Sequence, residues 1–377
     1  MNTSSFLAAL ALMTCMNAFV YFSYPPQWRK NKTANAVLLL FHVLAALNLA
    51  LIFAFYRVLP ESVKPLISRA GAIFYVMDIF LAIFFGIRLI LRFLKAKIAG
   101  KKDVPDRAMP FYRTDSGQAF LFVGVSLAIA VTGYFHITPL HRTEYEITVS
   151  KPADRESLKA VLIADLHAGA ATWKETYVQL REMILEEEPD VLLIAGDVFD
   201  ETTSETDVNE VRSVFEAVSP PLGKYYVYGN HDKGEDDWAA KTMRGMGVRV
   251  LEDEMTEIEG IQLIGRLDPK EKNMDIEELF ETLPVHEEKP LIVLQHRPVQ
   301  YRQLSEKGAD IALSGHTHGF NIPQFLAVGP FNDMYYGMRK YGPMTAVVTS
   351  GVSAWGFHYK FPAESEIAVL QIRFADR

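Results

Sequence analysis

Cysteine is almost absent from this sequence of 377 residues, and Cys15 is the single example. One thiol cannot close a disulfide within the chain, so burial of apolar groups must stabilise the fold instead. Cys15 lies inside a hydrophobic run, and we therefore expect it to be an ordinary apolar core residue. The stretch Leu12–Cys15 does not predict lipidation, because no basic residue precedes it.

A surplus of positive charge is also missing. Lys and Arg number 38 against 46 Asp and Glu, which gives a formal net charge of −8. The acidic residues concentrate after residue 143, whereas the part before it is basic. A nucleic-acid-binding surface needs Lys and Arg to displace counterions, so we expect no nucleic-acid partner.

Hydrophobic residues make up 49% of the chain and concentrate before residue 136. Several runs approach the roughly 20 apolar residues that cross a bilayer as a helix. No basic segment precedes the first run and others follow it, which favours membrane anchors over a cleaved signal peptide. A buried helical domain of a soluble protein is the alternative, but the polar stripe of soluble surface helices is missing. We predict an all-α transmembrane bundle of about four helices in residues 1–140, spanning Phe6–Phe22, Ala34–Tyr56, Gly71–Leu91 and Gln118–Phe135.

The loops between these runs give an orientation. Cytoplasmic loops of membrane proteins carry an excess of Lys and Arg. The loop after the third run is the most basic, and the second loop, with Arg57, Lys64 and Arg69 against Glu61, weakens the contrast. We therefore expect the first and third loops to be cytoplasmic. Alternation of the spans then places the N-terminus and residues 141–377 on the extracytoplasmic side of a multi-pass cell-membrane protein. The basic residues are Arg29, Lys30 and Lys32 in the first loop and Arg92, Lys95, Lys97, Lys101, Lys102, Arg107 and Arg113 in the third.

Two charged residues, Asp78 and Arg88, interrupt the third run. An ionisable residue inside a membrane span is a candidate for function. The structural alternative, which we favour, is that Asp78 is protonated or hydrogen-bonded between helices and that Arg88 extends to the interface.

From Glu144 onward, short apolar runs alternate with charged, helix-like stretches, which implies an α/β fold. Each apolar run stops at a residue with a polar, ligand-type side chain. Because ligands bind beyond the carboxyl ends of strands in open α/β sheets, we expect these side chains to converge. The runs are Leu158–Ala164 before Asp165, Val191–Ala195 before Gly196-Asp197, Tyr225–Tyr228 before Gly229-Asn230-His231-Asp232, Leu291–Leu294 before Gln295-His296, and Ile311–Leu313 before Ser314-Gly315-His316-Thr317-His318.

The side chains at these positions predict a pair of metal ions. Carboxylates and imidazoles without thiolates suit Mn²⁺ first, with Fe or Zn²⁺ as alternatives. Seven donors exceed the need of one ion, whereas two ions sharing a carboxylate use about this many and can clamp a phosphoryl group. Any one of them alone is a turn residue or a core histidine, but their ordered recurrence after apolar runs indicates a site. The candidates are Asp165, His167, Asp197, Asn230, His296, His316 and His318, with His231 and Asp200 beside them.

Together, these blocks resemble the calcineurin-like metallophosphoesterase superfamily over roughly Leu158–Ile372. The resemblance implies a four-layer α/β/β/α sandwich in residues 141–377. It implies one ion held by Asp165, His167 and His318, a second held by Asn230, His296 and His316, and a bridging Asp197. Metal-activated hydroxide would then attack phosphorus, His231 would assist the leaving group, and Asp200 would orient His231.

The sequence also departs from parts of that superfamily. Glu201 and Asp232 stand where protein Ser/Thr phosphatases carry Arg and Glu, which argues against a phosphoprotein phosphatase. The stretches Gly315–Gly319 and Val248–Asp268 are similar to a membrane-associated subgroup of transmembrane metallophosphoesterase-domain proteins and UDP-diacylglucosamine pyrophosphohydrolase-like enzymes. Gly319-Phe320-Asn321 replaces the Gly-Gly-Gln of that subgroup, so the substrate stays open.

Two classes of function remain. The first is a membrane-anchored hydrolase of phosphoester or pyrophosphate bonds, with a lipid-linked substrate as its narrower form. The second is a non-catalytic membrane sensor or scaffold that retains the fold. Aromatic and apolar residues late in the chain either line an acyl-accepting surface or fill the core, namely Tyr335, Tyr336, Met338, Trp355, Phe357, Tyr359 and Phe361.

Overall fold

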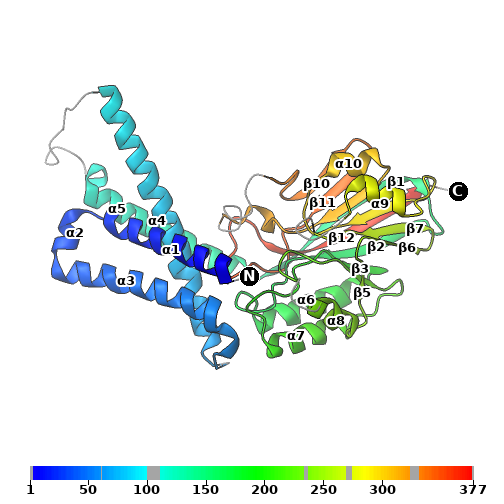
Figure 1. Cartoon of the computed structure of the whole chain (residues 1–377), viewed down its shortest axis with the longest axis horizontal. Helices are drawn as coiled ribbons and strands as arrows, with labels where there is room; N and C mark the ends of the chain where they lie inside the picture. Colours follow the sequence, from blue (N-terminus) through cyan, green and yellow to red (C-terminus); the bar gives the residue numbers. More distant parts are fainter. Residues whose placement is uncertain are drawn as a thin grey trace. The chain divides into compact units, whose positions relative to one another are not determined.

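A computed structural model describes residues 3–60, 62–99, 111–232, 237–268, 274–322 and 331–375. The chain divides into two compact units, Met1–Tyr134 and Phe135–Arg377. Helices make up the first unit, and two β-sheets with their covering helices make up the second (Figure 1). This division falls a few residues before the boundary that the sequence predicts at residue 140.

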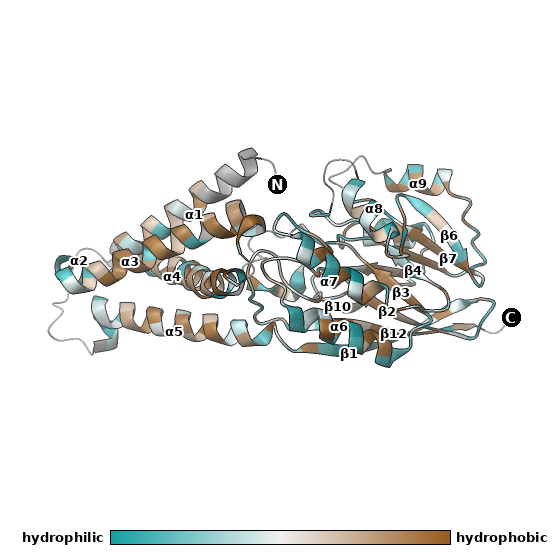
Figure 2. Ribbon diagram, turned by 90° about the horizontal axis from the view of Figure 1, so that it is seen from below, coloured by the Kyte–Doolittle hydropathy of each residue, from teal (hydrophilic) through white to brown (hydrophobic). Residues whose placement is uncertain are grey.

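The N-terminal unit has a helix in each predicted span, and most residues of these helices are hydrophobic (Figure 2). Large apolar side chains such as Val37 and Phe120 are exposed on it, as expected of surfaces that contact lipid. Leu66–Lys95 and Asp115–His136 are long and apolar enough to cross a membrane, whereas Ala11–Ser23 and Lys32–Asn48 are shorter. The four-span bundle therefore stays a prediction. The elements are α1 (Thr3–Ser23), α2 (Pro26–Lys30), α3 (Lys32–Ala50), the turns Leu51–Phe55 and Tyr56–Val58, α4 (Lys64–Ala99), the turn Phe111–Arg113, and α5 (Asp115–His136).

The two charged residues that interrupt the third predicted span, Asp78 and Arg88, lie close to polar side chains of this unit. Asp78 Oδ1 lies 3.5 Å from His42 Nδ1, and both side chains are buried. Asp78 therefore faces a polar side chain of another helix, although the two atoms form no hydrogen bond. Arg88 Nη2 contacts Asp115 Oδ1 at 2.5 Å, so its charge is compensated by a carboxylate.

Cys15 is exposed on α1, so the expectation of a core position was wrong. The physical reason is that this part of α1 directs apolar side chains outward as well as inward. The loop residues Glu61, Lys101, Lys102 and Arg107, which enter the topology argument, lie outside the described residues.

Two six-stranded sheets form the C-terminal unit, which confirms a mixed α/β fold. In the first sheet β2, β3, β4 and β5 are parallel to one another, and in the second β7, β8, β9 and β11 are. The first sheet has the order β1 (Leu140–Pro152), β12 (Ser365–Ala375), β2 (Ser157–Ile163), β3 (Val191–Ile194), β4 (Lys224–Tyr226), β5 (Arg249–Val250); the second has β10 (Gly337–Tyr341), β11 (Met344–Val348), β9 (Ile311–Ser314), β8 (Leu291–Leu294), β7 (Ile261–Gly265), β6 (Glu254–Ile258).

Alternation along the strands divides the apolar side chains among three cores. Leu162 and Leu193 of the first sheet share one core with Leu294 and Leu313 of the second. The opposite face of the first sheet packs with α6, α7 and α8, and that of the second packs with α9 and α10. These helices are α6 (Lys174–Glu187), α7 (Glu205–Phe215), α8 (Trp238–Arg244), α9 (Ile276–Thr282) and α10 (Tyr301–Glu306).

Replacing Leu193 by Ala tests the core between the sheets. The side chain is 1% exposed, so its truncation leaves a cavity that should lower the free energy of unfolding by about 2–5 kcal/mol. Denaturant unfolding of the detergent-solubilised chain measures this loss. Leu185→Ala is the matched control: Leu185 is 45% exposed on α6, and the change should stay within about 0.5 kcal/mol. Equal effects of the two variants would contradict the packing described.

Candidate metal centre

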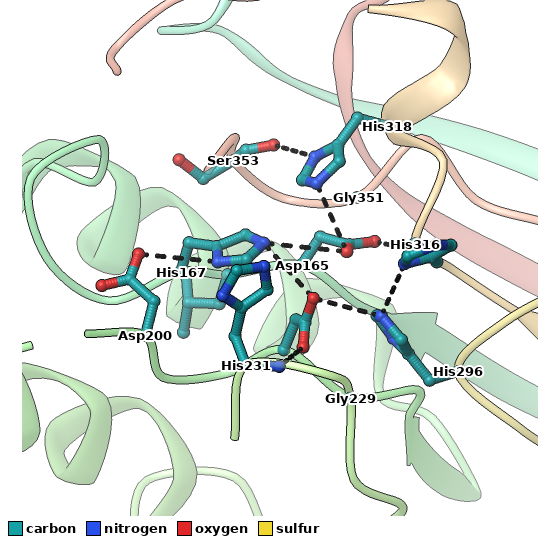
Figure 3. A network of polar contacts seen from close by, with 12 residues as sticks. Asp165, His167, Asp200, Gly229, His231, His296, His316, His318, Gly351 and Ser353 are labelled. Carbon is teal, nitrogen blue, oxygen red and sulfur yellow. Dashed lines mark hydrogen bonds and ion pairs between the residues drawn. The ribbon is translucent and has the colours of Figure 1, made fainter. Parts of the chain in front are cut away.

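Two groups of buried ligand-type side chains lie where the parallel strands end. Asp165, His167 and His318 each offer one atom, and these atoms lie within 4.8 Å of one another. The same distance encloses atoms of a second group, Asp197, His296 and His316. The loops after β2 and β3 supply the three residues from the first sheet, and those after β8 and β9 supply the three from the second. Folding thus gathers six of the seven predicted donors (Figure 3). The first group has the predicted members, and the second contains Asp197 beside His296 and His316.

Asp197 belongs to the second group and also faces the first. Its Oδ2 lies 3.1 Å from His296 Nε2 in the second group and 3.6 Å from His167 Nε2 in the first. One carboxylate oxygen therefore faces both groups, which is the position that a bridging ligand requires.

The seventh donor, Asn230, follows β4 and is flanked by residues that contact Asp197. The backbone N–H of His231 donates to Asp197 Oδ1 at 2.8 Å. On the other side, a Cβ placed on Gly229 would lie 2.0 Å from the same oxygen, so only glycine allows this approach. Asn230 is thereby held next to the carboxylate that joins the two groups.

Five of these residues have a positive φ in the left-handed region, a backbone conformation that is energetically costly for residues other than glycine. The φ values are 53° at Asp165, 43° at His167, 52° at Asp197, 73° at His316 and 49° at His318. Hydrogen bonds between the loops hold these conformations: His167 N donates to Asp197 O at 3.0 Å, and His316 N donates to Asp165 Oδ2 at 2.9 Å. The loops therefore fix one another.

Asp232 is a positioning residue whose role sequence reasoning missed. Its buried carboxylate accepts hydrogen bonds from the backbone N–H groups of Asp197 at 2.5 Å, Phe199 at 2.9 Å and Gly229 at 2.8 Å. It thus ties the loop after β3 to the loop after β4. The signal available in the sequence was its place at the end of the block Gly229–Asp232.

The electrostatics of the site call for added positive charge. Burial raises the pKa of Asp165 to about 6. Burial alone would lower the pKa of His296, but the carboxylates of Asp197 and Asp165 raise it to about 10. The pKa values of His316 and His318 are held well below their usual range by burial. The carboxylates of Asp165 and Asp197 thus favour the protonated form of His296. The low pKa values of His316 and His318 favour their neutral forms, and neutral imidazole is the form that binds metal.

Buried polar atoms without hydrogen-bond partners point to the same conclusion. They include Asp165 Oδ1, both ring nitrogens of His167, and Asn230 Oδ1. Buried polar atoms without a hydrogen-bond partner are rare in folded proteins, and such atoms commonly bind a water or an ion. His296 donates from Nδ1 to Ala195 O at 2.7 Å, which directs Nε2 into the site. This set of oxygen and nitrogen donors fits divalent cations.

His231 is paired with a different carboxylate from the one the sequence predicts. Its Nδ1 lies 3.0 Å from Glu201 Oε2, and this contact, outweighing burial, lowers the pKa of Glu201 to about 2. Asp200 Oδ2 instead lies 3.5 Å from His167 Nδ1, while Asp200 Oδ1 accepts two hydrogen bonds from Thr202. These contacts turn Asp200 toward His167, so the carboxylate that contacts His231 is Glu201 and not Asp200.

Some of the aromatic and apolar residues late in the chain are buried, as core residues would be, and others are exposed, as a surface for acyl chains would require. Phe357 and Tyr359 are buried, whereas Tyr336 and Met338 are exposed. Trp355 lies beside His231, with ring centroids 5.1 Å apart. One aromatic residue of the set therefore reaches the site.

The match to a protein family, together with these groups of ligand-type side chains, supports a hydrolase of phosphoester bonds. Residues 158–320 match the family model described as calcineurin-like phosphoesterase. The chain carries a calcineurin-like metallophosphoesterase domain, as its sequence motifs predict.

Curated proteins resemble the chain beyond this domain. An "Uncharacterized metallophosphoesterase" of Helicobacter pylori is 27% identical over 345 residues, covering 85% of each chain. A "Transmembrane protein with metallophosphoesterase domain" of Danio rerio is 28% identical over 284 residues, 68% of this chain and 63% of that protein. Among solved structures, TT1561 of Thermus thermophilus aligns with a TM-score of 0.35 and 13% identity, covering 52% of this chain and 90% of that one.

Gly229→Ala tests the crowding around Asp197. The added methyl group would overlap Asp197 Oδ1, so the carboxylate must move. A displacement of about 1 Å can cost about 100-fold in rate, and we expect at least that loss of phosphodiester turnover together with lower bound metal. Gly124→Ala, whose Cβ would meet nothing within 4 Å, is the control. Full activity and metal content in Gly229→Ala would refute this account of the site.

Proposed function

We propose that the C-terminal unit is a dinuclear-metal hydrolase of phosphoester or pyrophosphate bonds that works at a membrane. The observation that carries this proposal is the position of Asp197 Oδ2 between two groups of ligands. In our proposal the three cores around the two sheets correspond to a four-layer α/β/β/α sandwich, with the site at the ends of its strands.

The residues divide the work as follows. Asp165, His167 and His318 would hold one divalent ion, Asn230, His296 and His316 would hold the other, and Asp197 would be shared between them. When bound, the ions supply positive charge that polarises the phosphoryl group and acidifies an attacking water. Mn²⁺ suits these donors best, with Fe or Zn²⁺ as alternatives.

His231 donates a proton to the leaving oxygen. Burial alone would lower the pKa of His231, but the carboxylates of Asp197 and Glu201 raise it to about 9, which favours the donor form at neutral pH. Glu201 holds the ring by its Nδ1, leaving Nε2 for the substrate. Asp200 Oδ2 lies 3.5 Å from His167 Nδ1, and its charge would favour the orientation of that ring.

Membrane anchoring supports a substrate that resides in the bilayer. The two helices long enough to span a membrane, and a relative whose name includes "transmembrane", support attachment. Attachment to a bilayer would raise the effective concentration of lipid-linked phosphoesters for the catalytic unit.

Asp197→Ala and His316→Ala test the metal-dependent mechanism. Each removes a ligand, so we expect at least about a 100-fold loss of turnover of bis(4-nitrophenyl) phosphate with Mn²⁺. Chelation of the wild-type protein should have the same effect, and added Mn²⁺ should reverse it. His141→Ala, on the exposed part of β1, is the control. Undiminished turnover in both ligand variants would exclude the mechanism, and a wild-type protein that binds no metal would favour a sensor or scaffold.

The orientation in the membrane has its own test. We propose that an even number of spans places both the N-terminus and the catalytic unit outside the cytoplasm. Basic residues in the first and third loops support this orientation. A reporter that is active only outside the cytoplasm, fused after Arg377, should be active. Activity of a reporter that works only in the cytoplasm would overturn the topology.

A further inference from the structure

Lys360 is a lysine with no exposed surface, which is rare for a charged side chain. Its ammonium group donates hydrogen bonds to two backbone carbonyl oxygens, that of Ser350 at 2.6 Å and that of Gly351 at 2.7 Å. Both belong to the short segment Ser350–Ser353, which follows β11. Lys360 thus fixes the start of this segment from inside the protein.

The segment Ser350–Ser353 lies directly against Asp165 of the first group of ligands. A Cβ placed on Gly351 would lie 2.7 Å from Asp165 Cβ, so the backbone of the segment touches this side chain. Ser353 N donates to Asp165 O at 3.0 Å, which helps to hold the left-handed backbone of Asp165. The position of the segment therefore decides the position of this ligand.

The same segment contacts His318, a second ligand of that group. Ser353 O lies 3.3 Å from His318 Nδ1, which can donate to it (Figure 3). The other ring nitrogen, Nε2, is thereby turned toward Asp165 Oδ1 at 3.6 Å. A Cβ on Gly319 would lie 2.7 Å from Ser350 Cβ, so the turn after His318 also packs on the segment.

The second group of ligands is connected to this segment less directly. His316 N donates to Asp165 Oδ2 at 2.9 Å, which is a link through the first group. The His296 ring is held by Ala195 O at 2.7 Å, in the loop after β3. A displacement of Ser350–Ser353 should therefore disturb the first group more than the second.

We propose that Lys360 is a positioning residue for the first divalent ion: it holds Ser350–Ser353 against Asp165 and His318, and thereby sets the affinity of their group for the ion. This inference rests on the proposed function. Without the ammonium group, two buried carbonyl oxygens lose their donor, which disfavours the observed course of the segment. Loss of groups that orient metal ligands lowers metal affinity by about 10–100-fold.

The positive charge of Lys360 would act in the opposite direction. A buried cation near a metal site repels the ion. An uncharged residue at this position would therefore strengthen metal binding if charge alone mattered, and would weaken it if positioning dominates. The sign of the change separates the two roles.

Lys360→Met tests the proposal in the full chain in detergent. Calorimetric titration with Mn²⁺ gives the affinities, and elemental analysis after removal of free metal counts the ions. We expect about two ions per wild-type chain, and in the variant one ion bound about tenfold more weakly while the affinity for the other falls less than about threefold. Combined with His318→Ala, Lys360→Met should cause no further loss; combined with His316→Ala, it should leave no tightly bound ion.

Lys224→Met is the matched control. Lys224 is also buried, and its ammonium group donates to the carbonyl oxygens of Phe215 and Met246, which lie outside the ligand loops. This variant should keep both ions at wild-type affinity. If Lys360→Met does not fold, Lys360→Gln, which keeps a donor but is too short to reach both carbonyl groups, should show the same selective loss.

The possible outcomes separate this inference from the proposed function. Wild-type or tighter Mn²⁺ binding by the folded Lys360 variant, or an equal loss in Lys224→Met, would overturn the inference alone. A wild type that binds no Mn²⁺ would overturn the proposed function as well.

Discussion

The candidate metal centre depends on holding one buried carboxylate between two groups of imidazole and carboxylate ligands. Asp197 occupies that place, and much of its surroundings serves to keep it there. Asp232 accepts its backbone N–H, His231 donates to its Oδ1, and Gly229 leaves the space its oxygen needs. A charged group removed from water is expensive unless hydrogen bonds and counter-charges surround it. The loops after β3 and β4 provide the hydrogen bonds. Cations bound by the surrounding donors would provide the counter-charge.

The same constraint explains the unusual backbone of the loops. Five ligand residues adopt a left-handed conformation, at a cost of about 1–3 kcal/mol each. Such conformations persist only where the surroundings leave no alternative. Here each loop begins at the end of a buried parallel strand, and cross-loop hydrogen bonds such as that from His316 N to Asp165 fix its course. The sheets therefore do more than carry the ligands, because their packing balances the strain of the loops.

The sequence predicted the parts of this arrangement that follow from strand ends and residue type. Apolar runs that stop at Asp165, Asp197 and His296 indicated both the α/β class and the gathering of donors. It did not predict which of two adjacent carboxylates, Asp200 or Glu201, faces His231, because side-chain length and the hydrogen bonds of Thr202 decide that. Nor did the sequence predict that Asp232 supports the loops, because its partners are backbone N–H groups, which nearly every residue carries. The exposed position of Cys15 could not be predicted for another reason: where a helix is apolar on all sides, its sequence does not show which face is buried.

Each group of ligands draws on both sheets: His318 joins Asp165 and His167, and Asp197 joins His296 and His316. An ion in either position would span the seam between the sheets. Because anything that binds the folded state alone stabilises it, metal affinity and domain stability are then one linked quantity. In a chain whose one thiol can form no internal disulfide, the cations would serve as its cross-links, and depletion of metal would loosen the contact between the two sheets at the ends of their strands.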